Sequence, residues 1–221
     1  MRYLKWVMAR LEGPRAERTV ILLALVLSLP ALFAGFSIDE YVQRVRWKAG
    51  LWRFLNDCFV FVSGDPGRIH REFREGFGIW WTTLDSRTAF YRPLAAATHA
   101  LDLRLWPDSS ALMHLHTLLW FAALLGALGA LYRRFFTPRV ACLALAIFAW
   151  DDARGQVLSW IAKRNALLAG LLGVLAVLAY DRWRRDGWRP GAWLGPLLVA
   201  GSLLSVEIGR ASCRERVYLC V

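Results

Sequence analysis

The chain has 221 residues, of which 57% are hydrophobic and 20% are charged, whereas a soluble globular domain is about 45–50% apolar and about 25% charged. Its 28 Lys and Arg residues outnumber its 17 Asp and Glu residues, and the net charge of +11 suits either nucleic acid or an anionic lipid surface. The apolar residues come in long uncharged blocks, which exclude a disordered chain and favour a lipid bilayer, not nucleic acid, as the partner.

Five uncharged blocks are candidates for membrane spans, since a helix needs about 20 apolar residues to cross the hydrocarbon core. The third block is much shorter than the others and ends at two acids, so we expect a short or broken span there. The sequence therefore predicts an all-α fold, a polytopic membrane helical bundle. In chain order the blocks are Thr19–Phe36, Ala111–Tyr132, Val140–Trp150, Asn165–Tyr180 and Gly191–Val206.

The density of arginine beside the blocks predicts their orientation, because cytoplasmic loops carry an excess of Lys and Arg. Residues 1–18 and the turns Arg133–Arg139 and Arg182–Arg189 are rich in positive charge, and they are alternate loops. We expect these three segments on the cytoplasmic side. The long segment 37–110 is nearly balanced in charge, and we expect it on the outer side, with four further spans over 111–206.

This outer loop is too long to be a simple connection, and loops of such length usually carry function or structure of their own. Tyr41–Phe54 alternates apolar and basic residues, which predicts an amphipathic helix lying on the membrane surface. The Gly and Pro content of Ser63–Gly67 predicts a turn. Pro93 can open a helix, and Leu94–Trp106 then runs apolar at helical spacing. The polar members of this helix are His99, Asp102 and Arg104.

Two acids, Asp39 and Glu40, directly follow the first block, at its outer mouth. One interpretation is a solvated cap of the span. The other is a carboxylate placed as a general base at the boundary between lipid and water. The sequence alone leaves both interpretations open.

The loop after the short third block carries charge at both of its ends. Asp151 and Asp152 begin it, and ionisable groups at that depth are costly unless they serve a function, which favours a cavity reaching into the membrane. A mere cap remains the alternative. Lys163 and Arg164 close the loop, where they either snorkel towards the interface or hold a phosphate.

The histidines and cysteines indicate no metal site. His114 and His116 are two positions apart, so on a helix they point to nearly opposite sides and cannot share a metal unaided. His70 and His99 have no companion at ligand spacing, and we expect the four histidines to make ordinary polar contacts. The four cysteines show no CxxC or Cys/His spacing, which excludes a zinc module and a disulfide-stapled secreted domain. The cofactor stays unknown, and the use of a divalent metal stays open, although no motif indicates one.

The order of these features resembles the N-terminal part of a C-type (GT-C) polytopic glycosyltransferase, of the protein O-mannosyltransferase-like and tetratricopeptide-associated kinds. The resemblance covers residues 19 to 206 and rests on IDEY after the first span, then FYRPLAAATHALDLRLWP leading to ALMHLHTLLW, and finally SWIAKRNALLAGLLGVLAVLAY. The chain departs from the family at two points. Its acidic pair is Asp-Glu rather than Asp-Asp, and Thr117 stands where relatives often have Asn.

The resemblance implies an enzyme of a bacterial inner membrane that moves a sugar from a polyprenyl-phosphate carrier to an acceptor on the outer face. It implies that Asp39 deprotonates the acceptor hydroxyl and that Glu40 supports or replaces it. It also implies a set of substrate-binding residues. These are Arg92, Lys163 and Arg164 for the carrier's phosphate, and Asp151 and Asp152 for the sugar or a metal.

The end of the chain differs from the rest. Residues 207–217 read EIGRASCRERV and resemble a translated sequencing adapter, since their codons can contain AGATCGGAAGAGC. We therefore expect 207–221 to be non-native and the chain to be the front part of a longer protein, inactive alone. A genuine basic tail is the alternative. Two other functions also stay open, a non-enzymatic transporter subunit or scaffold and an inactive gene fragment. A scaffold would place Asp39, Asp151 and Arg164 on separate surfaces.

Overall fold

The computed structural model describes residues 14–76, 83 and 87–206, so the adapter-like segment 207–221 and the N-terminal residues 1–13 lie outside the described residues. Nearly all of the described secondary structure is helical. The elements are α2 (Pro14–Ser28), η1 (Leu29–Phe33), α3 (Ile38–Trp47), α4 (Leu51–Asp57), β1 (Val60–Ser63), α5 (Pro66–Arg74), β2 (Arg87–Ala89), α6 (Pro93–Leu105), α7 (Ser110–Phe135), α8 (Pro138–Trp150), α9 (Ala153–Ser159), η2 (Ile161–Lys163), α10 (Arg164–Asp186) and α11 (Gly191–Ser205).

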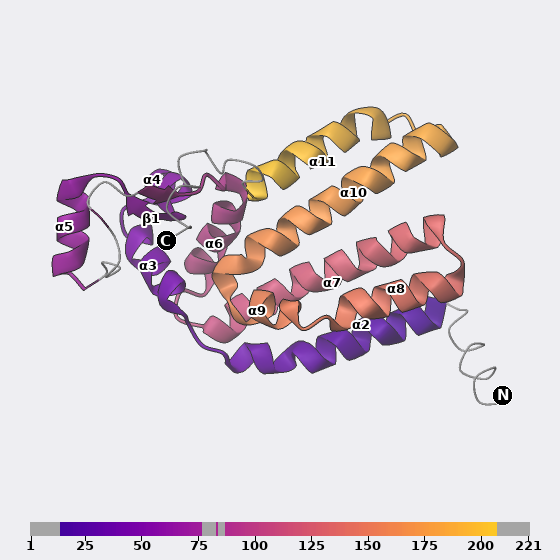
Figure 1. The fold of residues 1–221 in the computed structure, drawn as a ribbon, viewed down its shortest axis with the longest axis horizontal. Helices are drawn as coiled ribbons and strands as arrows, with labels where there is room; N and C mark the ends of the chain where they lie inside the picture. The colour runs from indigo at the N-terminus through magenta and orange to yellow at the C-terminus, as the bar shows by residue number, and fades with distance from the viewer. Residues whose placement is uncertain (1–13, 77–82, 84–86, 207–221) are drawn as a thin grey trace.

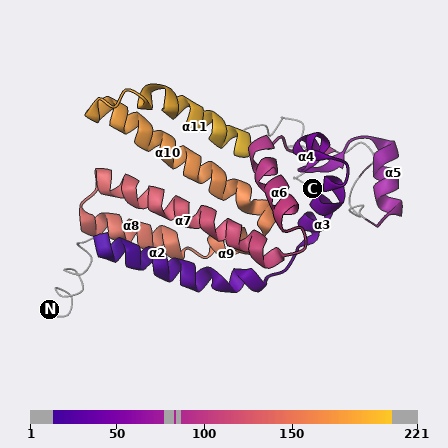
Figure 2. The ribbon, with the colours of Figure 1, turned by 180° about the vertical axis from the view of Figure 1, so that it is seen from behind.

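The elements form two parts, which Figure 1 shows side by side. Five helices, α2, α7, α8, α10 and α11, make the long-helix bundle. The segment from α3 to α6 makes a smaller outer unit at one end of it. Within the bundle α11 packs on α10, α10 on α7, α7 on α8 and α8 on α2, an order that the view from behind also shows (Figure 2). The outer unit is thus attached where α7 and α10 begin.

Three helical segments of the described chain are long and apolar enough to cross a membrane, namely Ala16–Phe33, Ser110–Phe135 and Ile161–Asp186. They contain or largely overlap the first, second and fourth predicted spans. The third and fifth blocks form shorter apolar helices, Pro138–Trp150 and Gly191–Ser205. The short third helix was expected, because Asp151 ends its apolar run.

Local chemistry explains where the helices begin and end. The Ser109 hydroxyl caps α7 by accepting a hydrogen bond from the amide of Leu112 at 3.3 Å. Pro138 opens α8 at the first helical turn, where a missing N–H costs nothing. Gly187 ends α10 in the left-handed conformation, with φ of 68°.

The bundle is apolar both inside and outside. Phe121, Leu125 and Leu145 are fully buried between α2, α7, α8 and α10. Large apolar side chains such as Leu119 and Ile147 are exposed on the outer faces of the same helices. A helix that is apolar all round is typical of a membrane span or the core of a large protein. The exposed apolar faces therefore support a membrane protein.

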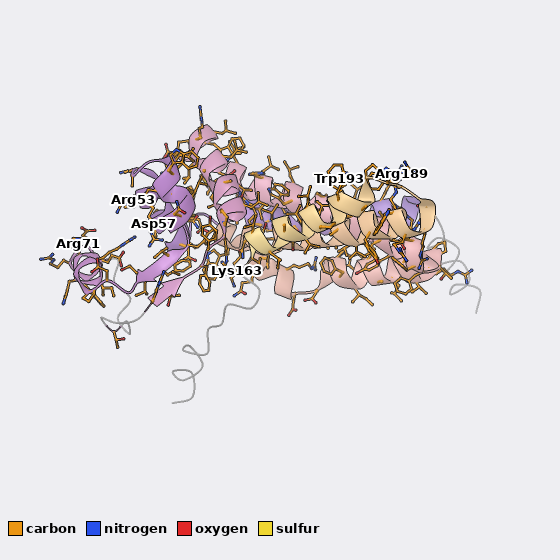
Figure 3. The ribbon with its side chains drawn as sticks, turned by 90° about the horizontal axis from the view of Figure 1, so that it is seen from above. Arg53, Asp57, Arg71, Lys163, Arg189 and Trp193 are labelled. Atoms are coloured by element: carbon orange, nitrogen blue, oxygen red, sulfur yellow. The ribbon has the colours of Figure 1, made fainter. Side chains whose placement is uncertain are left out.

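The two predicted arginine-rich turns lie together at the end of the bundle away from the outer unit. Figure 3 shows Arg189 at this end and Arg53 and Arg71 at the other. Ion pairs join the helices here, since Arg134 contacts Asp181 and Asp186, each at 2.5 Å, and thereby links α7 to α10. Arg133 pairs with Glu17 of α2. The charged residues at this end therefore also join the helices, through ion pairs between α7 and α10 and between α7 and α2.

The outer unit differs from the prediction in two respects. The predicted surface helix over Tyr41–Phe54 is two helices, α3 and α4, because Gly50 has a positive φ of 96° that interrupts the helical path. The all-α prediction also missed an antiparallel pair, in which β1 and β2 align Val60 with Ala89 and Ser63 with Arg87. Strands this short carry too weak an alternation to be recognised in a sequence.

Two other expectations for this unit are confirmed. The predicted turn at Ser63–Gly67 connects β1 to α5, and the Asp65 carboxylate caps α5 by accepting a hydrogen bond from the Gly67 amide at 3.0 Å. The helix predicted after Pro93 is α6, and it begins at that proline. Its buried face packs against α4 and contains Ala95, Ala96 and His99.

Candidate functional site

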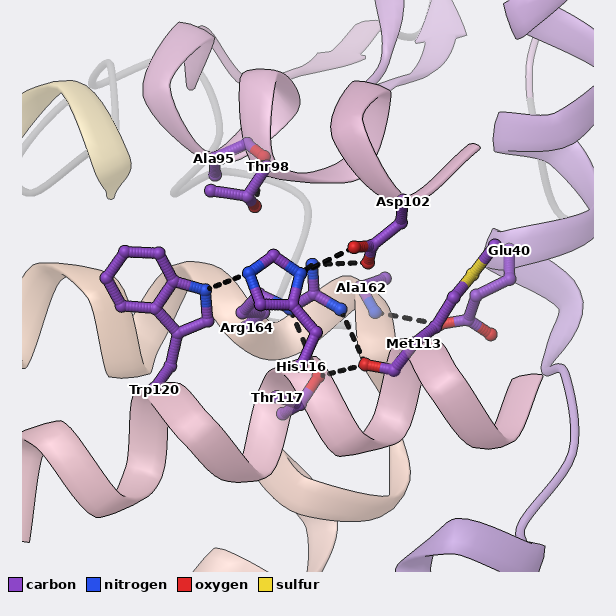
Figure 4. A network of polar contacts seen from close by, with 10 residues as sticks. All are labelled: Glu40, Ala95, Thr98, Asp102, Met113, His116, Thr117, Trp120, Ala162 and Arg164. Carbon is purple, nitrogen blue, oxygen red and sulfur yellow. Dashed lines mark hydrogen bonds and ion pairs between the residues drawn. The ribbon is translucent and has the colours of Figure 1, made fainter. Parts of the chain in front are cut away.

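The candidate site lies at the junction of the bundle and the outer unit, where α3, α6, α7, η2 and α10 meet (Figure 4). Two groups of polar residues occupy this junction. One contains Asp39, Glu40 and Lys163, and the other is a buried network around Arg164.

Glu40 joins two distant parts of the chain. It is buried, and its Oε2 accepts hydrogen bonds from the amide of Ser37 at 2.6 Å and from the Ser37 hydroxyl. The bond from the Ser37 amide is the Glu40 half of a capping box at the start of α3. Its Oε1 accepts a hydrogen bond from the amide of Ala162 at 2.7 Å. Glu40 thereby fixes the N-terminus of α3 against η2, and with it the neighbouring side chains Asp39 and Lys163.

Asp39 is half-buried, and its carboxyl group interacts with the side chain of Trp160 and with the charge of Lys163. Burial raises the pKa of its carboxyl group, and the charge of Glu40 acts in the same direction. The Trp160 indole, Arg46 and Lys163 lower that pKa, but they do not compensate for burial. A carboxylate with a raised pKa is a stronger base, which is the property that proton abstraction requires.

Lys163 is the last residue before α10 and carries a positive charge. Its ammonium lies 4.4 Å from the centre of the Trp160 ring, a cation–π contact. The side chain is only partly buried. Lys163 therefore lies against the Trp160 ring, within electrostatic reach of Asp39, and remains partly accessible to an anion.

Arg164, the next residue, has the opposite environment, with 0% of its side chain exposed. Its Nη1 pairs with Asp102 Oδ2 at 2.5 Å, its Nη2 donates to the carbonyl of Met113 at 2.9 Å, and its Nε donates to Thr117 Oγ1 at 3.1 Å. Figure 4 shows these contacts converging from α6, α7 and α10. Arg164 thus joins three helices and has its hydrogen-bond donors committed to the protein.

His116 extends this network to Trp120. The Trp120 indole N–H donates to His116 Nε2 at 2.9 Å, and His116 Nδ1 lies 2.5 Å from Asp102 Oδ1. An indole can only donate, so Nε2 is an acceptor and carries no proton. His116 Nδ1 also lies 3.3 Å from Nη1 of Arg164. His116 therefore connects Trp120 to the ion pair of Asp102 and Arg164.

The structure brings together Asp39, Glu40, Lys163 and Arg164 among the predicted site residues. The other predicted site residues lie elsewhere. Asp151 and Asp152 are exposed at the connection of α8 and α9, where the Asp151 carbonyl accepts a hydrogen bond from Arg154 at 2.5 Å.

Arg92 also lies apart from Asp39, Glu40, Lys163 and Arg164. It directly precedes the first residue of α6. Its guanidinium stacks over the ring of Phe90 at 4.4 Å and over that of Phe59 at 5.2 Å. Aromatic rings of the outer unit therefore form part of the surroundings of Arg92. The phosphate-binding role expected for Arg92 stays a prediction.

Sequence reasoning missed Asp102, His116, Thr117 and Trp120 as members of one network. A signal was present, since Asp102 is an acid on a largely apolar helix, and such a charge requires a partner if it is buried. The partner could not be identified, because it comes from helices far along the chain. His114, in contrast, makes the ordinary polar contacts that were expected, with the carbonyls of Leu158 at 3.1 Å and Gly35 at 3.0 Å.

No group of His, Cys, Asp and Glu residues suited to a metal ion occurs in the described part of the chain. A search of protein families, curated proteins and solved structures found no match to this chain. The properties that the structure itself defines are a nearly all-α fold and three helices able to cross a membrane. The charged junction at one end of these helices is the feature from which function must be inferred.

Proposed function

We propose that the chain forms the front part of a GT-C-like glycosyltransferase that transfers a sugar from a polyprenyl phosphate to an acceptor on the outer face of the membrane. The observation that carries this proposal is that a carboxylate with a raised pKa, Asp39, lies within electrostatic reach of a partly accessible cation, Lys163, where the apolar helices meet the outer unit. A lipid-linked sugar phosphate has its charged phosphate at the membrane surface and its polyprenyl tail in the bilayer, so it could reach this junction. Apolar side chains exposed along the bundle support contact with lipid.

In the proposed reaction Asp39 accepts the proton of the acceptor hydroxyl. The acceptor oxygen then bonds to the anomeric carbon of the sugar, while the bond from that carbon to the carrier's phosphate oxygen breaks. The electron pair of the broken bond stays with the phosphate, and Lys163 stabilises the charge that develops there. Arg164 acts as a positioning residue, because its donors are already held by Asp102, Met113 and Thr117.

The proposal also includes the location of the protein. We infer a multi-pass protein of a bacterial inner membrane, with its N-terminus in the cytoplasm and the outer unit in the periplasm. The position of the arginine-rich turns at the end opposite the outer unit supports this orientation.

A non-enzymatic scaffold or transporter subunit is the second candidate. The observation that favours it is the complete burial of Arg164 in an ion pair, since such a pair can simply join helices. The exposed position of Asp151 and Asp152 on a separate connection also agrees with it. The two candidates differ in whether Asp39 is needed for chemistry.

The test is sugar transfer by membranes that contain the full-length protein of which this chain is proposed to be the front part, because the chain alone is expected to be inactive. Radiolabelled polyprenyl-phosphate sugars serve as donors. Asp39→Asn should lower the transfer rate about 100-fold to 10,000-fold, the usual contribution of a general base. Asp65→Asn is the matched control, because Asn caps a helix as well as Asp does and α5 should form unchanged. Equal transfer by Asp39→Asn and the parent, or no transfer by the parent itself, would overturn the proposal and favour the scaffold.

A further inference from the structure

The acids of α10 at the end of the bundle away from the outer unit are already paired with arginines. Asp181 forms ion pairs with Arg134 at 2.5 Å and with Arg185 at 2.9 Å. Asp186 also pairs with Arg134, at 2.5 Å. Any further arginine near the end of α10 therefore adds a positive charge that these acids do not balance through an ion pair.

Three further arginines lie at this end, and none of them forms an ion pair within the described part of the chain. They are Arg182 and Arg184, near the end of α10, and Arg189, in the turn to α11. All three side chains are exposed. We call these three residues the tip arginines. Because charges of one sign gather on one short segment, this segment attracts anions.

Tryptophans accompany the tip arginines. The guanidinium of Arg182 lies 5.3 Å from the centre of the Trp188 ring, and that of Arg184 lies 5.6 Å from the centre of the Trp183 ring. Trp193, in the first turn of α11, is 60% exposed, and Figure 3 shows it near this end. Tryptophan is enriched where a membrane meets water, because its ring is apolar and its N–H is polar. This end of the bundle therefore has the composition typical of the headgroup level of a bilayer.

The directions of the tip arginines favour lipid headgroups over other anions. Residues two positions apart on a helix differ by about 200° in direction, so Arg182 and Arg184 point to nearly opposite sides of α10. A single small anion does not suit both, and a nucleic acid would lie along one face only. The headgroups of a leaflet surround a helix end and reach both sides at once. Val177, farther into α10, is 49% exposed and suits the lipid tails below those headgroups.

We propose that the tip arginines bind the phosphate groups of anionic phospholipids in the leaflet at this end of the bundle. Each guanidinium donates hydrogen bonds to headgroup oxygens, a contact that suits its planar set of donors. The protein thereby selects anionic over zwitterionic lipids around the α10–α11 turn. This inference requires that the bundle crosses a membrane, and it does not depend on the proposed enzymatic function.

The test measures which lipids stay with the purified full chain. The protein in a neutral detergent is mixed with equal amounts of phosphatidylglycerol and phosphatidylcholine that have the same acyl chains. The lipids retained after gel filtration are counted by mass spectrometry, and phosphatidylglycerol should be enriched. The variant Arg182→Gln/Arg184→Gln/Arg189→Gln should lower this enrichment about fivefold or more, since one basic residue near an anionic surface contributes about that much.

The matched control is Arg53→Gln/Arg71→Gln/Arg74→Gln, which removes the same charge from exposed positions of the outer unit, at the other end of the molecule. It should keep the enrichment of the parent. No enrichment in the parent, or an equal loss in this control, would overturn the proposal. Retention of a labelled DNA duplex by the parent, without lipid enrichment, would also overturn it and assign the charge to nucleic acid.

A second measurement needs no variant and so does not depend on whether the variants fold. The enrichment of phosphatidylglycerol by the parent should fall several-fold as the salt concentration rises from about 0.05 M to about 0.5 M, because salt screens exposed charges. An enrichment that does not change with salt would show that apolar contacts, not the tip arginines, select the lipid.

Discussion

Lys163 and Arg164 are consecutive basic residues with opposite environments. Successive residues on a helix point about 100° apart, so only one of them can face the core. Lys163 faces outward over Trp160, and Arg164 faces Asp102. A buried ion pair of this kind is strongly coupled, since removing one partner leaves an uncompensated charge that costs about 3–5 kcal/mol. The residue that best suits a ligand is therefore the lysine.

The pKa of Asp39 offers a test that does not require enzyme activity. Lys163→Met should raise this pKa further, because it removes a cation that lowers it. Lys48→Met is the control, since Lys48 is exposed at the end of α3. The measurement is the carbon chemical shift of labelled Asp carboxyl groups during a pH titration in micelles. An unchanged Asp39 titration in Lys163→Met, or an equal shift in Lys48→Met, would contradict the described geometry.

The raised pKa of Asp39 also determines how this residue makes the folding stability depend on pH. Because the folded pKa of Asp39 lies above its unfolded value of about 3.9, the folded protein holds this proton more tightly than the unfolded chain. That contribution to stability is complete below the unfolded pKa and is lost as the pH rises through the folded pKa. Proton abstraction by Asp39 needs the opposite condition, a pH above the folded pKa.

At the scale of elements, the start of α11 packs closely against the end of α10. A Cβ on Gly191 would overlap the carbonyl oxygen of Ala179 and lie 2.8 Å from Cβ of Trp183. Small residues permit such approach between membrane helices. Farther along the pair, the hydroxyl of Ser202 donates to the carbonyl of Ala169 at 2.9 Å. The packing of α11 therefore depends on one glycine at its beginning.

Gly191→Ala should lower the free energy of unfolding by about 1–3 kcal/mol, the usual cost of overpacking, because backbone atoms of α10 cannot move aside. Gly126→Ala is the matched control within α7. No atom lies within 4 Å of a Cβ built there, and alanine favours the helix by up to about 1 kcal/mol. Denaturant titration in mixed micelles measures both. Equal stability of the two variants would show that α11 does not pack on α10 in this way.

At the scale of the whole molecule, charge is distributed unevenly along the long axis. The two arginine-rich turns occupy one end of the bundle, and the outer unit occupies the other (Figure 3). The apolar length of α7 and α10 separates these ends. If the bundle crosses a membrane, the two ends must therefore face different compartments.

Labelling with a membrane-impermeant maleimide tests this arrangement. Thr137→Cys in the α7–α8 turn and Glu75→Cys after α5 both place a thiol at an exposed position. In intact cells we expect labelling of Glu75→Cys only, and in lysed cells labelling of both. Labelling of both, or of Thr137→Cys alone, in intact cells would contradict the proposed orientation.

The native cysteines need little change for this experiment. Cys58 and Cys142 are buried, and burial also raises the pKa of the Cys58 thiol, which disfavours the reactive thiolate. Cys213 and Cys220 lie outside the described residues and are replaced by Ser. The parent with these two replacements should stay unlabelled in both conditions.

Much of the fold could be predicted because its signals are local. The apolar blocks gave the helices of the bundle, Pro93 marked the start of α6, and Asp151 marked the end of α8. Gly50 was not recognised as a break, since a glycine within an alternating pattern is compatible with a continuous helix. The β1–β2 pair was missed because its strands are short and lie far apart in the sequence.

The candidate site could be predicted only in part, for a related reason. Asp39, Glu40, Lys163 and Arg164 were recognised because each pair adjoins an apolar block, a position visible in the sequence alone. Asp102 and His116 were not joined to them, because nothing local shows which faces of α6 and α7 meet.

The sequence by itself determined that the chain is helical and apolar and where its charged boundaries lie, since hydropathy, proline and capping residues act within a few positions. Only the tertiary structure decided which charges meet. It buried Arg164 against Asp102, left Lys163 accessible, and placed Glu40 on the amide of Ala162. The physical reason is that burial and pairing depend on contacts between distant helices, and these contacts set the pKa and the partners of each polar group.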